Sequence, residues 1–470
     1  MLCPVLKVEF REGFIVKYLQ IGVFKASLMG GLMGVAAFAA SNSPMTFNKD
    51  VLPVLQKNCQ ECHRPGEIAP FSLLTYTDAR PWAKAMKAAV VSQKMPPWFA
   101  DPKYGHFAND KRLSEKDINT LVSWVDNGAV EGDVKDRPAP LKFPEGWQIK
   151  PDVVVEMPKA FDLPAKGTIN YKYILVKANF KEDMWVEAAE MRPGNPSVVH
   201  HGKVWVRPPG SHWMEKAVPG EAYEQETQRD VIGRNMGADG NDILGKFNPG
   251  LGPQEFTVEG AAKFIPKGSD LVFEMHYTAN GKPMSDISKL GFTLAKNPPQ
   301  RRYFFATGPS AGNLVIAAGD GNAEAVSELT VALDNVKLVY AQPHMHLRGK
   351  DMDLRAIYPN GETEILMRSK WDFNWQQGFD FEKPVALPKG TRLIVVSHFD
   401  NSPNNPNNPD PKAEVRWGFQ NWEEMSNCFI GLTMDLKDDP NKMFIRSGPS
   451  LLKPVTGVSG PTLMTLQAKN

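Results

Sequence analysis

Short runs of β-type residues recur along the chain from residue 152 to residue 400, with Gly, Pro, Asn and Asp between them. The runs are DVVVEM (152–157), INYKYILVKANF (169–180), DMWVEAAEM (183–191), VVHHGKVWV (198–206), DLVFEMHYTA (270–279), KLGFTLA (289–295), NVKLVYAQPHMHLRG (335–349) and RLIVVSHFD (392–400). Runs of this length and spacing predict an all-β, jelly-roll-like sandwich architecture. The roughly 320 residues after residue 151 are long for one core, so we expect two sandwich domains, 152–300 and 301–470.

The pattern before residue 134 is helical instead. TFNKDVLPVLQKNC (46–59) places apolar residues on one helix face, and SEKDINTLVSWVDNGA (114–129) begins at Ser114 with an acidic first turn and ends at Gly128. We therefore expect a small all-α domain over residues 45–133. The proline-rich and charged stretch 134–151 predicts a linker to the first sandwich.

Cys59, Cys62 and His63 form the C-x-x-C-H pattern of covalent c-type haem attachment. Two thiols bind the macrocycle, and the adjacent histidine supplies an axial nitrogen. A C-x-x-C pair alone could also be a redox pair or half of a zinc site, but the sequence has no second cysteine pair and no βαβ pattern around this one. We therefore expect one covalent haem c.

Met95 is the expected second axial ligand of that haem. It stands directly before two prolines, which hold its thioether on a rigid loop, although a lone methionine can also simply fill a core. Met86 and His106 are the reserve candidates. With these features, residues 45–133 resemble a small class I cytochrome c, and the resemblance implies an electron-transfer role.

Six further histidines fall within the predicted strands: His200, His201, His276, His344, His346 and His398. One buried histidine is often structural, but the spacing of these favours metal binding. His344 and His346 are two apart, so on a strand they leave the same face. His200 and His201 are adjacent, so they can share an ion only at a strand end or a β-bulge. Imidazole without thiolate or carboxylate suits copper, and a thioether adds preference for Cu(I).

The N-terminus predicts export. Lys17 and Lys25 precede an uncharged run of 15 residues, ASLMGGLMGVAAFAA (26–40), which is short for a membrane span and typical of a signal peptide over residues 1–40. An uncleaved membrane anchor is the alternative. Of the four cysteines, Cys3 falls within the expected signal peptide and haem attachment would use Cys59 and Cys62, so Cys428 is left unpaired. We therefore expect a periplasmic or secreted haem protein without structural disulfides. The formal net charge of +1 provides no positive electrostatic field that would attract nucleic acid, so we do not expect a nucleic-acid partner.

Four motifs together resemble the copper type II, ascorbate-dependent monooxygenases, the family of peptidylglycine α-hydroxylating monooxygenase and dopamine β-monooxygenase. They are VVHHGKVWV, FEMHYTANG, QPHMHLRGK and WEEMSNCFIGL, in the family's order over roughly residues 152–440. The resemblance implies an electron-storing copper held by His200, His201 and His276. It also implies a second copper, the site of oxygen binding and C–H cleavage, held by the catalytic set His344, His346 and Met425.

The chain departs from that family at the substrate positions. Gln342 stands where the peptidylglycine enzyme has a carboxylate-binding arginine, and Phe429 replaces a tyrosine, whereas Asn427 is retained. Glycine-extended peptides are therefore not the expected substrate. His398 matches no ligand, so we expect it to pack or to support one.

Combined, these patterns predict a periplasmic copper-dependent monooxygenase. It would hydroxylate a small organic substrate with O2 and receive electrons from a protein or a small reductant through haem c. Two alternatives are an electron-transfer subunit of a larger redox complex and a copper-binding protein without hydroxylase activity.

Overall fold

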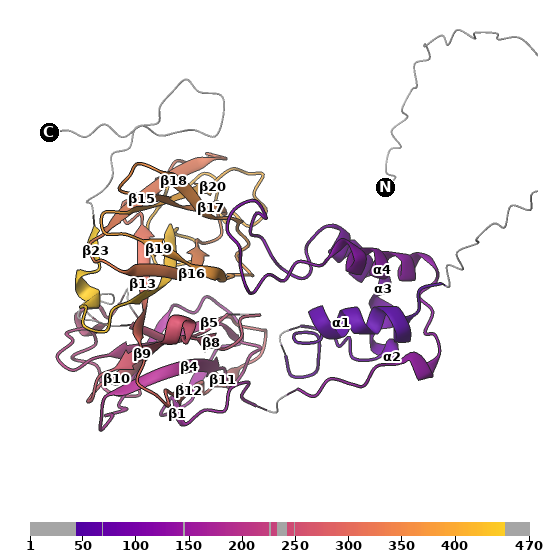
Figure 1. Ribbon diagram of the computed structural model, residues 1–470, viewed down its shortest axis with the longest axis horizontal. Coiled ribbons are helices and arrows are strands. Elements are labelled where there is room, and N and C mark those ends of the chain that lie inside the picture. Colours follow the sequence, from indigo (N-terminus) through magenta and orange to yellow (C-terminus); the bar gives the residue numbers. More distant parts are fainter. Residues whose placement is uncertain are drawn as a thin grey trace, which may run out of the picture. The chain divides into compact units, whose positions relative to one another are not determined.

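The computed structural model describes residues 44–67, 69–143, 146–224, 227–232, 242–248 and 250–446, whose helices and strands are drawn in Figure 1. The expected signal peptide, 1–40, lies outside these residues. Among these described residues, strands take up 37 % and helices 13 %. Among the described helices, none has the length and apolar character needed to cross a membrane.

The helical elements before residue 137 are short. They are η1 (Phe47–Val51), α1 (Leu52–Asn58), α2 (Tyr76–Ala79), η2 (Arg80–Trp82), α3 (Ala83–Val91), α4 (Glu115–Asp126) and η3 (Val134–Asp136). Ser114 caps α4 as expected, because its side chain accepts the backbone N–H of Asp117 at 3.1 Å. The apolar faces of α1, α3 and α4 pack around the buried Phe47 and Trp124. Further along the chain lie α5 (Arg229–Ile232), η4 (Val258–Gly260) and η5 (Pro440–Lys442).

The strands of the described residues form three large sheets and two small ones. One mixed sheet of nine strands runs β1 (Val153–Glu156), β12 (Lys289–Leu294), β4 (Met184–Arg192), β9 (Ala261–Ile265), β13 (Arg301–Ser310), β22 (Asn427–Met434), β16 (Val336–His344) and β19 (Phe379–Leu387), with β8 (Gln254–Glu255) beside β4. A second sheet runs β6 (Ala222–Tyr223), β3 (Lys172–Val176), β10 (Asp270–Tyr277), β5 (Val199–Arg207) and β7 (Asp242–Phe247). The third runs β18 (Thr363–Lys370), β17 (Gly349–Ile357), β20 (Arg392–Phe399), β15 (Ala323–Val331) and β23 (Phe444–Arg446). The two-stranded sheets pair β11 (Met284–Asp286) with β2 (Phe161–Leu163), and β14 (Val315–Ile316) with β21 (Val415–Arg416). Each sequence run that predicted a strand contains one.

The expected fold class, a small all-α cytochrome c domain followed by two all-β sandwich domains, is wrong. The nine-stranded sheet continues across the expected boundary at residue 300, because β9 pairs in parallel with β13 and places Ala261 opposite Arg301. One hydrophobic core likewise contains residues from both sides of it, among them Phe273 and Phe429. The sequence patterns identify individual strands, but they do not show which strands are neighbours.

The helical segment is not a self-contained all-α domain either. After α3 the chain leaves the helices and joins the sheets, where Ala100 bridges to Ser369 and Phe107 bridges to Phe381. Trp98 and Ala100 are buried in the core of the later strands. Residues 98–107 therefore add β structure to a region that was expected to be purely helical.

Candidate metal centre

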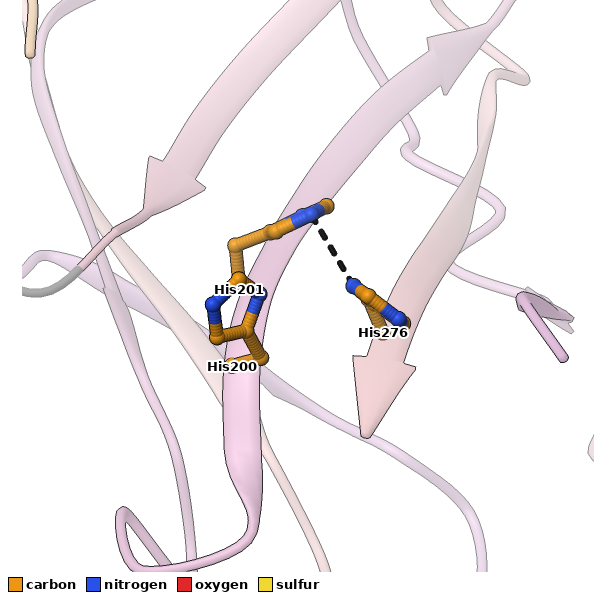
Figure 2. Close-up of side chains that lie close together, drawn as sticks. All are labelled: His200, His201 and His276. Carbon is orange, nitrogen blue, oxygen red and sulfur yellow. Dashed lines mark hydrogen bonds between the residues drawn. The ribbon is translucent and has the colours of Figure 1, made fainter. Parts of the chain in front are cut away.

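Three histidines meet where β5 and β10 pair, and we call them the first histidine set: His200, His201 and His276 (Figure 2). One ring nitrogen from each lies within 4.8 Å of the others. The ladder places His276 opposite His201 and then Tyr277 opposite Val199, so that His200 is the extra residue of a β-bulge. This is the irregularity that adjacent histidines need in order to converge. The set can bind a metal ion.

The first histidine set is connected to its surroundings by polar and ring contacts. His276 Nδ1 lies 3.1 Å from His201 Nε2, and the Tyr171 hydroxyl lies 3.1 Å from the same His201 nitrogen. On its other side, His276 Nε2 lies 3.3 Å from Asn421 Nδ2. His200 Nδ1 is buried and has no hydrogen-bond partner in the described part of the chain. Because buried polar atoms are rarely left unpaired, this nitrogen is suited to a metal.

His344, His346 and Met425, which we call the second histidine set, lie at the end of the β16–β22 pair. His344 lies opposite Asn427 in that ladder, and the ring centres of His344 and His346 are 5.4 Å apart. Met425 comes to the same place because the Glu424 Oε2 atom accepts both the Met425 N–H, at 3.3 Å, and the His346 N–H, at 2.8 Å.

Both imidazoles of the second set are held through their Nδ1 atoms. His344 Nδ1 lies 3.0 Å from Gln376 Oε1, and His346 Nδ1 lies 3.2 Å from the Glu423 carbonyl oxygen. An Nδ1–H donated in this way leaves Nε2 as the basic atom, which is how protein surroundings prepare a histidine for a metal. The His346 Nε2 atom is buried, with no hydrogen-bond partner among the described residues. The Met425 sulfur accepts from Asn427 Nδ2 at 3.4 Å.

Burial keeps these imidazoles neutral. It lowers the pKa of His200 and of His346 to about 4, and it lowers the pKa of His201, His276 and His344 well below the ordinary value. Neutral imidazole is the form that binds metals, so protons do not compete for these nitrogens near neutral pH.

Sequence reasoning missed the residues that orient the ligands. Glu424 is fully buried, and burial raises its pKa to about 8 although three backbone N–H groups point at its carboxyl group and act in the opposite direction. In the sequence, only the position of Glu424 directly before Met425 could have pointed to this role. Gln376 and Asn421 lie in loops, where no periodicity marks them.

Gln342 and Phe429, which differ from the copper monooxygenase family that the motifs resemble, both contact lysine side chains. Gln342 Oε1 lies 3.0 Å from the Nζ atom of the buried Lys246. The ring of Phe429 is covered by Lys203, whose Nζ lies 4.8 Å from the ring centre. His398 belongs to neither histidine set, and its Nδ1 atom forms an ion pair with Asp351 at 2.6 Å.

The haem candidates lie in the helical segment. Cys59, Cys62 and His63 share one turn, in which the Cys59 carbonyl oxygen accepts the N–H groups of Cys62 at 3.2 Å and His63 at 2.9 Å. His63 Nδ1 lies 3.2 Å from the Phe71 carbonyl oxygen, so its Nε2 is the atom left for a ligand role. Burial raises the pKa of the Cys59 thiol to about 12.

The candidates for the second axial haem ligand lie at different places in the structure. Met95 is half-buried just after α3, Met86 is buried in the helical core, and His106 is exposed. The His106 carbonyl oxygen accepts the Glu382 N–H at 2.8 Å, which places its backbone beside β19.

A pocket of about 440 Å³ opens beside the first histidine set. It is lined by His276 and Asn421 together with the turn Ala165–Ile169 and the residues that follow β10. Its size suits a small organic molecule.

Comparisons with known proteins identify no relative. No protein-family model matches the chain, and no curated protein does. Structure comparison finds the VP2 subviral particle of infectious bursal disease virus, with 9 % identity, 65 % of this chain and 77 % of that chain covered, and a TM-score of 0.19. It also finds a putative secreted protein from Eubacterium rectale, with 9 % identity, 57 % and 69 % covered, and a TM-score of 0.18. At such TM-scores neither likeness indicates a shared fold or function.

Proposed function

We propose that this chain is an exported, copper-dependent monooxygenase that hydroxylates a small organic substrate with O2 and takes its electrons through a covalently attached haem c. The observation that carries the proposal is the convergence of three ring nitrogens within 4.8 Å in the first histidine set. A second set supports it, because its buried His346 Nε2 atom has no hydrogen-bond partner in the described part of the chain.

The donor atoms favour copper over other metals. The first set offers imidazole nitrogens alone, and the second adds the thioether of Met425, a soft ligand that prefers Cu(I). When bound, copper would supply the one-electron chemistry that oxygen activation requires. His200, His201 and His276 would hold one ion, and His344, His346 and Met425 the other.

The protein's own contribution is orientation and exclusion of water. Gln376 and the Glu423 carbonyl oxygen fix the rings of the second set, and Glu424 fixes the backbone that carries them. Burial of His201, His276, His344 and His346 keeps solvent from the donor atoms. The pocket beside His276 gives a small molecule access to the edge of this region.

The turn that carries Cys59, Cys62 and His63 would attach haem c, and Met95 would supply the second axial ligand. The contact of His63 Nδ1 with the Phe71 carbonyl oxygen supports the axial role, because it orients the ring and leaves Nε2 available. When bound there, haem c would supply one-electron transfer from an external donor.

Metal and haem analysis of protein isolated from the periplasm of a haem-attaching host tests the proposal. We expect about two copper ions and one covalent haem per chain, as the two ligand sets and the single C-x-x-C-H turn require. Substrate-dependent oxygen consumption should accompany them. Full copper content without oxygen consumption in the presence of any reductant would favour the copper-binding alternative instead.

A further inference from the structure

A buried lysine reaches from one large sheet to another. Lys246 belongs to β7 in the second sheet, and only 4 % of it is exposed. Its Nζ atom lies 4.1 Å from the ring centre of Phe305 and 4.1 Å from that of Tyr340, both on strands of the nine-stranded sheet. Because burying a lysine is costly unless its amine is hydrogen-bonded, the partners of the Nζ atom show what holds it there.

The Lys246 amine meets two polar side chains of β16. It lies 2.9 Å from the Tyr340 hydroxyl and 3.0 Å from Gln342 Oε1. The Tyr340 hydroxyl also donates to Gln342 Oε1, at 3.1 Å. Burial lowers the pKa of Lys246 well below its usual range, but an amine and an ammonium group can both donate to that oxygen. Two donors on one oxygen fix the orientation of the Gln342 amide.

The nitrogen of the same amide holds the loop that orients His344. Gln342 Nε2 donates to the Gln376 carbonyl oxygen at 2.9 Å, and the Gln376 Oε1 atom lies 3.0 Å from His344 Nδ1. Gln376 Nε2 is buried and has no hydrogen-bond partner in the described part of the chain. The place of the Gln376 side chain therefore depends on its backbone, which Gln342 holds.

Strand geometry brings these groups together. Tyr340, Gln342 and His344 alternate along a regular part of β16, so they leave it on one face. The loop crosses this face closely, because a Cβ atom at Gly378 would collide with the Tyr340 hydroxyl oxygen. Tyr340, Gln342, Gln376 and His344 are each at most 5 % exposed. Water is therefore not at hand to replace a hydrogen bond that is lost among them.

We infer that Lys246 and Gln342 are positioning residues for His344, which they reach through the backbone of Gln376. The inference rests on the proposed copper role of the second histidine set and deepens it, because it makes the orientation of one ligand depend on a strand of another sheet. It also gives Gln342 a role in holding a ligand rather than in binding substrate.

Nitrogen NMR of the histidine side chains tests the inference in the full chain, with copper removed by a chelator and the haem reduced. The chain has nine histidines, and the His344→Ala variant assigns the signal of His344. In the wild type we expect the Nδ1–H tautomer, because Gln376 Oε1 accepts that proton. Gln342→Glu keeps an acceptor for Lys246 and Tyr340 but offers no N–H to the Gln376 carbonyl oxygen. The His344 signal should therefore shift toward the Nε2–H tautomer.

Copper affinity gives a second readout of the same variant. Gln342→Glu should lower the affinity of the second set by about 10-fold or more, measured by chelator competition. The first set should keep its affinity, because the ring centres of His201 and His344 are 6.5 Å apart and Gln342 contacts neither ring directly.

Lys246→Met tests the distant end of the contact chain, because it removes the amine and keeps a side chain of similar length. We expect the same changes at smaller size, since the Tyr340 hydroxyl still donates to Gln342. Thr433→Val is the matched control. Thr433 is buried near the other end of β22, where its hydroxyl accepts from Arg301 Nε at 3.2 Å. This variant should lower Tm without changing the His344 tautomer or the copper affinity.

Each outcome has a separate meaning. An unchanged tautomer and affinity in Gln342→Glu would overturn the inference and leave the proposed function intact, and equal changes in Thr433→Val would do the same. If the wild type binds no copper at the second set, the proposed function fails, whereas the tautomer change in Gln342→Glu still shows that Gln342 positions His344. If Lys246→Met fails to fold, Gln342→Glu decides by itself, because it keeps the partners of Lys246.

Discussion

The buried carboxyl group of Glu424 accepts the backbone N–H of His346 at 2.8 Å, through the same oxygen that accepts the N–H of Met425. Its other oxygen accepts the N–H of Arg348 at 2.6 Å. One side chain thus fixes the backbone at two of the three proposed ligands of the second copper.

Glu424→Gln should weaken copper binding at the second set and spare the first. An amide has one acceptor oxygen, and its NH2 group would face a backbone N–H, so the loop that carries His346 and Met425 must shift. We expect a loss of roughly 10- to 100-fold in affinity for the second copper, measured by chelator competition. An unchanged affinity for both ions would show that Glu424 does not position this site.

Gln376→Ala should also weaken the second site, because it removes the partner of His344 Nδ1. Gln377→Ala is a matched control: the neighbouring glutamine accepts the Phe99 N–H at 3.1 Å and contacts no histidine of either set. We expect a loss of about 10-fold or more in copper affinity for Gln376→Ala only. Equal losses in the two variants would indicate a general effect on the loop.

Oxygen should reoxidise the reduced haem only through the copper ions. In the wild type with both coppers loaded, oxygen should reoxidise the haem. The His344→Ala and His276→Ala variants should each slow this reoxidation by orders of magnitude, as measured by rapid-mixing absorbance. His212→Ala serves as control, because His212 is exposed and belongs to neither set. Unaltered rates in both variants would mean that oxygen reacts at the haem.

Met95→Ala should leave the haem attached but lower its reduction potential. A methionine ligand raises the potential of a c-type haem, and its loss also changes the visible spectrum. Redox titration of the variant measures the shift. If spectrum and potential stay as in the wild type, the sixth ligand is another residue, and Met86→Ala and His106→Ala become the next variants.

His398 should stabilise the protein at low rather than high pH. Its hydrogen bond with Asp351 raises the pKa of His398, with Glu324 contributing at 3.5 Å. Because the folded pKa is raised, the stabilisation is fully present below the unfolded pKa of about 6.5 and is lost as pH rises through the folded value. His398→Gln should lower Tm near pH 6, by an amount worth at most about 1 kcal/mol, and the difference should shrink toward pH 9. A constant difference would exclude the ion pair as its source.

Local patterns predicted local structure well. Neighbouring residues in the sequence are enough to predict the strands at VVHHGKVWV and RLIVVSHFD and the helix cap at Ser114. They also predict that the adjacent histidines need a strand end or a β-bulge to converge, and the structure has a bulge at His200. The continuation of the nine-stranded sheet from β9 to β13 could not be predicted in this way, because the sequence of a strand does not show which distant strand pairs with it.

The same limit applies to the candidate centre. Spacing could bring His344 and His346 together, but the 6.5 Å between His201 and His344 depends on how loops from distant parts of the chain pack. For that reason the sequence alone could not identify Gln376 and Asn421 as residues that contact the histidines. They are ordinary polar loop residues until the fold places them beside an imidazole.

The place of β22 within the nine-stranded sheet constrains how the protein can be made. It lies between β13 and β16, although it follows both of them and β19 in the sequence. During synthesis the two neighbouring strands emerge first, with unpaired edges that invite wrong pairing. The chain cannot close its central sheet, or bring Met425 beside His346, until residue 434 has left the ribosome. The second histidine set can therefore form only after nearly all of the described chain has been made.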